Sequence, residues 1–159
     1  MSLTLRPARP DDSGLIFDFV CELADYERLR HEVEATPADI ERDLFGADPK
    51  AFCDIGEWDG VPAGFALWFY TYSTFRGRHG IFLEDIFVRP AYRGRGIAKA
   101  LMRRLAQRCV EEELGRFEWN VLDWNEPAIR FYRSVGAIPL DAWTMQRVSG
   151  EPLGRLAEG

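Results

Sequence analysis

The sequence contains no long apolar run. No segment approaches the roughly 20 consecutive apolar residues that a membrane-spanning helix needs. The N-terminal stretch MSLTLRPARPDD also lacks the apolar core and the small-residue cleavage site of a secretion signal. We therefore expect neither a membrane partner nor export, and the sequence predicts a cytoplasmic location.

Cysteine and histidine are scarce as well. The chain has three cysteines and two histidines, and the cysteines are widely spaced with no Cys-x-x-Cys pair. An odd number of separate cysteines is typical of reduced, structural thiols and not of a disulfide framework. Neither histidine has a metal-ligating partner at a useful spacing, and we find no Ser-His-Asp arrangement, so the sequence predicts no metal site.

Charge is unevenly distributed. The net charge of -6 argues against a nucleic-acid partner. From Arg89 to Arg104 six side chains are basic and none is acidic, whereas residues 11–43 contain several acidic patches. A basic site and an acidic site in one small domain would suit two ligands of opposite charge. Two solvated surfaces would explain the same composition, so charge alone leaves both interpretations open.

The apolar periodicity and the turn signals predict one domain over residues 1–159, since 47% hydrophobic residues are enough for a core. Strands are expected at 2–6, 51–58, 63–72, 81–88, 117–122 and 142–148, and helices at 12–29, 36–46, 96–114 and 125–135. This order predicts an α/β (α+β) fold, with a mixed, mostly antiparallel central sheet of six to seven strands and helices on both faces. The fourth and fifth strands should be parallel, because a helix of crossover length joins them.

A glycine pair opens the longest predicted helix. Gly94 and Gly96 follow the buried strand that ends at Val88. The first amides of a helix lack intrahelical partners and lie at the positive end of its dipole, and glycine lets a ligand approach the backbone closely. The pattern therefore predicts a pyrophosphate site, with a merely flexible helix start as the alternative. A nucleotide-binding protein is a third hypothesis, although the dinucleotide and P-loop fingerprints are incomplete.

The segment Arg93-Gly-Arg-Gly-Ile-Ala98 matches the Arg/Gln-x-x-Gly-x-Gly/Ala motif of the GNAT N-acetyltransferases, which the sequence resembles over most of its length. Other segments resemble the branch that contains the diamine (spermidine/spermine) and thialysine acetyltransferases. These segments are Glu22–Glu27, Phe69–Phe75, Phe82–Val88, Val121–Asn125 and Phe131-Tyr132. The resemblance implies the GNAT fold, acetyl-CoA as co-substrate, a small-molecule amine as acceptor and a homodimer.

The same resemblance implies the residues of the acetyl-CoA site. The pantetheine arm is expected along the backbone of Ile86, Phe87 and Val88, where the family splays two parallel strands apart at a bulge. The expected pyrophosphate contacts are Arg93, Gly94, Arg95, Gly96, Ile97, Ala98 and Lys99. The contacts expected on the other side of the cofactor are Asn125, Glu126, Pro127 and Ala128. Asn125 is also the expected cap of its helix, and it can serve in both ways.

Tyr132 is the residue that the resemblance assigns to proton transfer. A phenol with a pKa near ~10 can donate a hydrogen bond or a proton to the thiolate that leaves coenzyme A. Spacing alone leaves another interpretation open, because Ala128, Tyr132 and Val135 share one helix face, as core residues do.

The resemblance assigns Glu84 to the amine. An alkylamine is protonated at neutral pH, and a nearby carboxylate can bind the cation and accept its proton, directly or through a water. A sheet-face carboxylate paired with an arginine is the alternative. The next residue, Asp85, would point to the opposite face of the strand, so we expect it to be structural.

The resemblance also implies a set of substrate contacts, which are Tyr26, Glu27, Glu84, Glu118, Trp119 and Asn120. Tyr26 and Glu27 end the first helix, where a solvated helix end is the alternative. The acceptor is expected to be a thialysine- or lysine-like amino acid or a polyamine. An amino acid also needs a partner for its carboxylate, which Arg76 or Arg78 would supply.

The predicted function is thus an acyltransferase that moves acetyl from acetyl-CoA to a primary amine of a small molecule, by direct attack in a ternary complex. The alternative is a non-catalytic acyl-CoA sensor on the same fold, because a fold does not fix a function. The presence of both Tyr132 and Glu84 favours the enzyme.

Overall fold

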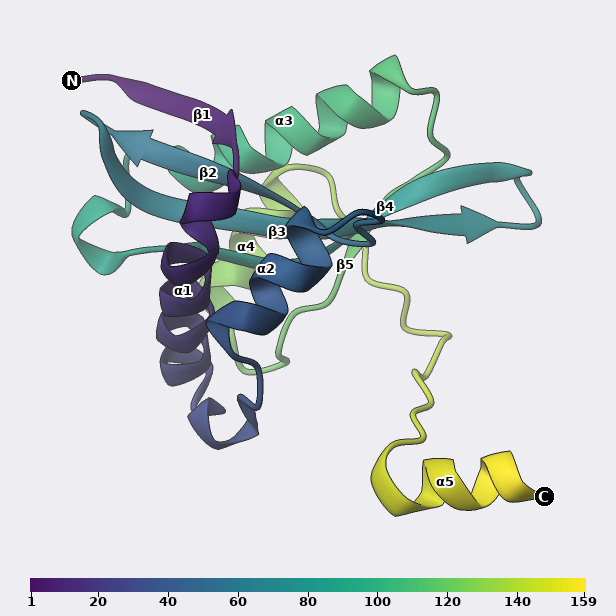
Figure 1. Ribbon diagram of the computed structural model, residues 1–159. Coiled ribbons are helices and arrows are strands. Elements are labelled where there is room, and N and C mark those ends of the chain that lie inside the picture. Colours follow the sequence, from purple (N-terminus) through teal and green to yellow (C-terminus); the bar gives the residue numbers. More distant parts are fainter. The chain divides into compact units, whose positions relative to one another are not determined.

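The computed structural model describes all residues from Met1 to Gly159, in two units that comprise residues 1–120 and 121–159 (Figure 1). The first unit contains β1 (Leu3–Pro7), α1 (Ser13–Glu27), α2 (Pro37–Phe45), β2 (Phe52–Trp58), β3 (Val61–Ser73), β4 (Arg78–Val88), α3 (Ile97–Glu111) and β5 (Phe117–Trp119). The second unit contains α4 (Glu126–Ser134) and α5 (Gly150–Glu158). None of these helices combines the length and the apolarity that spanning a bilayer requires.

The five strands form one sheet in the order β1-β2-β3-β4-β5. The first four are antiparallel to their neighbours, and β4 and β5 are parallel, as the crossover through α3 predicts. The mixed, mostly antiparallel sheet of an α+β fold is therefore confirmed. The predicted number of strands is wrong, since the sheet has five strands and not six or seven.

The missing strand is the one expected at 142–148. Within this segment only Trp143–Gln146 alternates apolar and polar residues as a strand does, the segment pairs with no other strand, and Trp143 and Met145 are exposed. A strand needs a neighbour to satisfy its backbone groups, and a sequence pattern cannot supply that neighbour. The chain instead forms α5 further on, where Pro152 in the first turn suits a helix start.

The connection between β2 and β3 is the two-residue turn that the sequence predicts. Asp59 and Gly60 both have positive φ, at 50° and 78°. Two such residues form the type of tight turn whose twist matches that of a hairpin. This turn places β2 and β3 side by side in the centre of the sheet.

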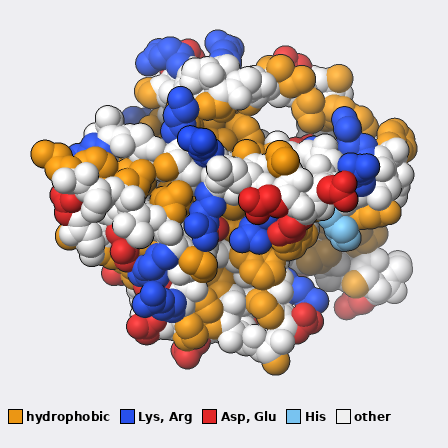
Figure 2. All heavy atoms as spheres, turned by 90° about the horizontal axis from the view of Figure 1, so that it is seen from above, with side chains coloured by type: hydrophobic (Ala, Val, Ile, Leu, Met, Phe, Trp, Pro, Cys, Tyr) orange, Lys and Arg blue, Asp and Glu red, His pale blue; other side chains and the backbone are white.

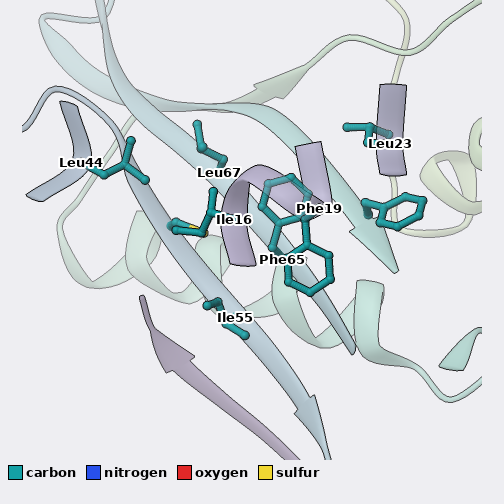
Figure 3. Packing of buried hydrophobic residues seen from close by; sticks show 9 residues of the cluster. Ile16, Phe19, Leu23, Leu44, Ile55, Phe65 and Leu67 are labelled. Carbon is teal, nitrogen blue, oxygen red and sulfur yellow. The ribbon is translucent and has the colours of Figure 1, made fainter. Parts of the chain in front are cut away.

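Helices cover both faces of the sheet, as predicted, with α1 and α2 on one face and α3 on the other (Figure 1). On the first face Phe19 of α1 stacks against Phe65 of β3, with ring centroids 5.2 Å apart (Figure 3). On the second face Gly56 makes room for α3, because a Cβ atom there would lie 2.9 Å from Ile97. Since Ile97 is the first residue of α3, this close packing fixes the start of the helix against the sheet.

Candidate active site

The N-terminus of α3 is the first component of the candidate site. Gly96, which precedes the helix, has a φ of 78°, and no side chain caps the first amides of α3. Thr36 caps α2 and Asn125 caps α4, whereas α1 and α5, like α3, have no side-chain cap. Gly94 also has a positive φ, and a Cβ atom at either glycine would meet no atom within 4 Å. The uncapped amides and the open space in front of them fit a diphosphate.

The six basic side chains between β4 and the middle of α3 fall into two groups. Four of them already contact protein groups, namely Arg89, Arg93, Arg95 and Arg104. Arg89, for example, forms an ion pair with Glu22 at 2.8 Å. Lys99 and Arg103 form no such contact. Figure 2 shows several basic side chains on the face of the molecule that is seen from above. Arg93 and Arg95 contact carbonyl oxygens and aromatic rings and no carboxylate, so their charges add to the positive potential of the helix start.

A β-bulge interrupts β4 at Glu84. Leu67 of β3 pairs with Asp85 of β4. The next residue of β3, Trp68, pairs with Leu83, so Glu84 has no partner across the strand pair. An extra residue of this kind bends its strand and re-aims the side chains around it. The bulge implied by the resemblance is thus present in this strand.

One edge of β4 is open beyond the bulge. The parallel partner β5 pairs only with Ile81–Leu83, while β4 continues to Val88. The backbone from Glu84 to Val88 therefore has β3 on one side and no strand on the other. Ile86, Phe87 and Val88, the residues predicted to accompany a pantetheine arm, all lie in this stretch.

Three carboxylates gather near this open edge. Asp85 is opposite Leu67, whose side chain lies in the core beneath α1, so Asp85 is on the α1 face of the sheet. Glu27 is the last residue of α1. Burial and the negative charges of Glu84 and Glu27 raise the pKa of Asp85 to about 7. None of the three carboxylates forms an ion pair with an arginine or lysine.

The first unit thus contains an uncapped helix start, an open strand edge and an acidic cluster without cationic partners, and comparison with known proteins identifies the family. Residues 17–137 match the acetyltransferase (GNAT) family. The chain belongs to the GNAT acetyltransferase family. Membership of this family implies acetyl-CoA as the acetyl donor.

Two relatives and one solved structure illustrate this kinship. The chain is 34% identical to a thialysine N-epsilon-acetyltransferase of Mus musculus, over 98% of either chain. It is 37% identical to an L-ornithine N5-acetyltransferase of Arabidopsis thaliana, over 77% of this chain and 51% of that one. An integron cassette protein from V. cholerae shares the fold with a TM-score of 0.83 and 23% identity, over 100% of this chain and 99% of that one. This GNAT enzyme is therefore thialysine acetyltransferase-like.

Asp85 is a candidate site residue that sequence reasoning missed. Strand alternation predicted a structural role for it, but no hydrogen bond or ion pair in the structure supports one. The useful signal was the pair of adjacent acids, Glu84 and Asp85, inside an otherwise apolar strand. Asp85 is half-buried beside the exposed Glu84 and has no cationic partner, and a carboxyl group with such a perturbed pKa is a candidate for a functional site.

The predicted substrate contacts in β5 have neighbours of their own in this GNAT chain. Glu118 forms an ion pair with Arg116 at 2.7 Å. Trp119 lies opposite Leu83, one residue before the bulge, with its ring centroid 4.9 Å from that of Phe117. Asn120 follows β5 and is exposed. Of these residues, Trp119 is next to the open strand edge, and Glu118 is already paired with Arg116.

The two arginines considered for a substrate carboxylate lie elsewhere. Arg78 begins β4 and pairs with Ser73, and Arg76 is in the turn before it. Arg78 is six residues from Glu84, which is roughly 20 Å along an extended strand. The hypothesis that these arginines bind an amino-acid carboxylate next to the acidic cluster is therefore not supported.

The remaining predicted residues belong to the second unit. Asn125 caps α4, since its side-chain oxygen accepts a hydrogen bond from the Ala128 amide at 3.5 Å, and Pro127 lies in the first turn. This confirms the expected cap. Tyr132 is half-buried in α4, with its ring centroid 5.5 Å from that of Phe131. The contacts of Asn125, Glu126, Pro127 and Ala128 with the cofactor, and the proton transfer by Tyr132, stay predictions.

Proposed function

We propose that this GNAT enzyme transfers the acetyl group of acetyl-CoA to a primary amine of a small molecule, by direct attack in a ternary complex. The acceptor is a thialysine- or lysine-like amino acid or a polyamine. The observation that carries the proposal is the cluster of Glu27, Glu84 and Asp85, three carboxylates without a cationic partner beside an open strand edge. The relatives named for thialysine and ornithine acetylation support an acceptor with a terminal amine.

Acetyl-CoA would be held by the backbone. The diphosphate is assigned to the uncapped amides that follow Gly96, with Lys99 adding charge. The pantetheine arm is assigned to the open edge at Ile86, Phe87 and Val88. When bound, acetyl-CoA supplies a thioester carbonyl as the electrophile. The Asn125–Ala128 segment is assigned to the opposite side of the cofactor.

The acidic cluster performs two tasks in this proposal. Negative charge attracts the ammonium form of the substrate into the site. The nitrogen must then lose a proton before it can attack, and a carboxyl group with a pKa near 7 is well matched to accept it at neutral pH. Asp85 has such a pKa, and Glu84 binds the ammonium or relays its proton through a water. Tyr132 Oη holds the proton that the departing sulfur needs.

A thiol-release assay with acetyl-CoA and a panel of thialysine, lysine, spermidine and putrescine tests this function. We expect free thiol to appear with at least one amine and only slowly without an amine. Calorimetry with coenzyme A provides the control for a folded, ligand-competent protein. Binding of coenzyme A without thiol release for every amine would favour the non-catalytic sensor, and no binding at millimolar concentration would overturn both functions.

We also propose that the enzyme is a homodimer in the cytoplasm. Large apolar side chains of the second unit are exposed, and burial against a second copy would remove them from water. They are Ile138, Leu140, Trp143, Met145, Val148, Leu153 and Leu156. The three free cysteines fit a reducing compartment. Sedimentation equilibrium at micromolar concentration should give twice the mass of the chain, and the mass of a single chain would contradict the dimer.

A further inference from the structure

The side chain of Arg93 is folded back onto the protein. Its Nε donates a hydrogen bond to the Val88 carbonyl oxygen at 2.9 Å. Its guanidinium carbon lies 5.5 Å from the centroid of the Phe87 ring and 5.0 Å from that of the Tyr26 ring. A guanidinium within about 6 Å of a ring face is held by the electrostatics of that face. A single side chain of the loop thus contacts the end of β4 and the end of α1.

The helix that carries Tyr26 is anchored one turn earlier. Glu22 of α1 accepts hydrogen bonds from Arg89, with Arg89 Nη2 at 2.8 Å from Glu22 Oε1. The Arg89 guanidinium also lies 4.6 Å from the centroid of the Phe19 ring. This ion pair fixes α1 against the residue that follows β4. The contact between Arg93 and Tyr26 therefore joins two elements that are already held in place, and it sets the position of the last turn.

That last turn carries Glu27, one of the three residues of the acidic cluster. Glu27 is the neighbour of Tyr26, and its charge acts on Asp85. Tyr26 is 37% exposed, so core packing alone does not fix its ring. The cation of Arg93 contributes nothing to the pKa of Asp85, which depends on burial and on two carboxylates. Arg93 thus contacts Tyr26, the neighbour of Glu27, without neutralising the negative charge of the acidic cluster.

We propose that Arg93 is a positioning residue for the amine site. Its side chain fixes the last turn of α1, which carries Tyr26, against the end of β4, the strand assigned to acetyl-CoA. The inference rests on the proposed function, and it assigns the Arg93 side chain to the acceptor as well as to the loop. Loss of the Arg93 side chain should raise the KM for the amine more than the Kd of coenzyme A. If Arg93 served only the diphosphate, its loss would raise the Kd of coenzyme A more than the KM for the amine.

The test compares Arg93→Met with the wild type. The KM for the amine should rise about two- to fivefold, as expected for an exposed cation–π contact, while the Kd of coenzyme A changes by less than about twofold. Arg93→Lys should recover part of the loss because it keeps the charge. The pH at which kcat/KM inflects should stay unchanged. A larger effect on coenzyme A than on the amine, or a shifted inflection, would overturn the proposal.

A double-mutant cycle with Tyr26→Leu isolates the contact itself. If the two side chains act together, Arg93→Met/Tyr26→Leu should raise the amine KM no further than the larger single change does. Arg42→Met is the matched control, because Arg42 pairs with Asp39 on the exposed face of α2. Additive effects of the two substitutions would contradict the proposal.

The same cycle can be measured by urea unfolding, which separates this inference from the proposed function. If the wild type acetylates no amine, the proposed function fails, yet the contact can still be examined. Non-additive shifts of the unfolding midpoint would then support the interaction between Arg93 and Tyr26. Additive shifts would show that the two side chains do not act on each other.

Discussion

At the scale of single residues, the ionisation of Asp85 connects the fold with the proposed chemistry. Its carboxyl group is half-buried on the α1 face of the sheet, next to Glu84 and Glu27 and without a cation. The protein keeps this arrangement although it disfavours the charged form of the side chain. A group that is destabilised in this way binds a cationic substrate well, because the substrate supplies the missing charge.

The pH dependence of turnover follows from this environment. For the wild type, kcat/KM for the amine should increase with pH and level off above about 7, because Asp85 accepts a proton only when ionised. Asp85→Asn should lower kcat about a hundredfold or more and remove this inflection. Steady-state rates from pH 5 to 9 provide the measurement. An Asp85→Asn variant with an unchanged profile would exclude Asp85 as the proton acceptor.

The carboxyl group of Asp85 should also make the free energy of unfolding depend on pH. The pKa of Asp85 is about 7 in the folded chain and about 4 in an unfolded one, so the folded state retains a proton that the unfolded state has lost. Its contribution to stability is fully present below about pH 4 and is lost as the pH rises through about 7. In the Asp85→Asn variant this loss of stability with rising pH should be absent.

Urea unfolding of both proteins at pH 5 and pH 8 measures the effect. At pH 8 the Asp85→Asn variant should be more stable than the wild type by up to about 4 kcal/mol, and the difference should shrink at pH 5. Asp48→Asn is a control, because Asp48 is exposed and pairs with Lys50. A variant that is less stable than the wild type at pH 8 would show that Asp85 has a stabilising partner.

At the scale of elements, the start of α3 combines a backbone requirement with a proposed binding role. Gly96 has a φ of 78°, which costs a residue with a side chain roughly 1 kcal/mol. Gly60 has the same φ in the turn between β2 and β3, and a Cβ atom at either position meets no other group. Gly96→Ala and Gly60→Ala should therefore lower stability by similar amounts, about 1 kcal/mol each.

Binding should distinguish the two glycines. Gly96→Ala places a methyl group in front of the uncapped amides, so the Kd of coenzyme A should rise about tenfold or more by calorimetry. Gly60→Ala should leave that Kd as it is in the wild type. Equal affinities in the two variants would show that the diphosphate does not bind at the start of α3.

The docking of α3 on the sheet depends on a buried carboxylate. Asp54 is 3% exposed, and its oxygens accept hydrogen bonds from Arg104 Nε at 2.6 Å and Trp68 Nε1 at 3.0 Å. Asp54→Ala leaves both donors without a partner and should cost about 3 kcal/mol in urea unfolding. Asp43→Ala, which removes an exposed partner of Arg42, should barely move the unfolding midpoint. Equal midpoints for the two variants would contradict this role.

Most elements of the first unit could be predicted from the sequence, because turns and helix starts depend on residues that are close together in the chain. The Asp59-Gly60 turn, the Pro37 start of α2 and the Gly94-Gly96 loop each require residues with special backbone preferences. The proposed role of Asp85 could not be predicted, because the bulge at Glu84 depends on pairing with β3. The strand expected at 142–148 failed for the same reason, since pairing is a property of two segments and not of one.

At the scale of the whole molecule, the two ligands of the proposed reaction carry opposite charges. The start of α3 offers amides, Lys99 and Arg103 to an anion, whereas Glu27, Glu84 and Asp85 offer negative charge to an amine. Both sets belong to the first unit and flank the open half of β4. In this proposal only Glu27 of the acidic cluster comes from the acidic patches of residues 11–43, and Arg89 and Arg104 of the basic stretch form ion pairs within the fold.

In the proposed reaction this enzyme joins the acetyl group of acetyl-CoA to a primary amine held by the acidic cluster. Mass spectrometry of the reaction products, with thialysine and spermidine competing in one mixture, tests it directly. We expect an acetylated amine in an amount that matches the coenzyme A released, and almost none from Asp85→Asn. Tight binding of coenzyme A by the wild type without any acetylated amine would contradict the claim.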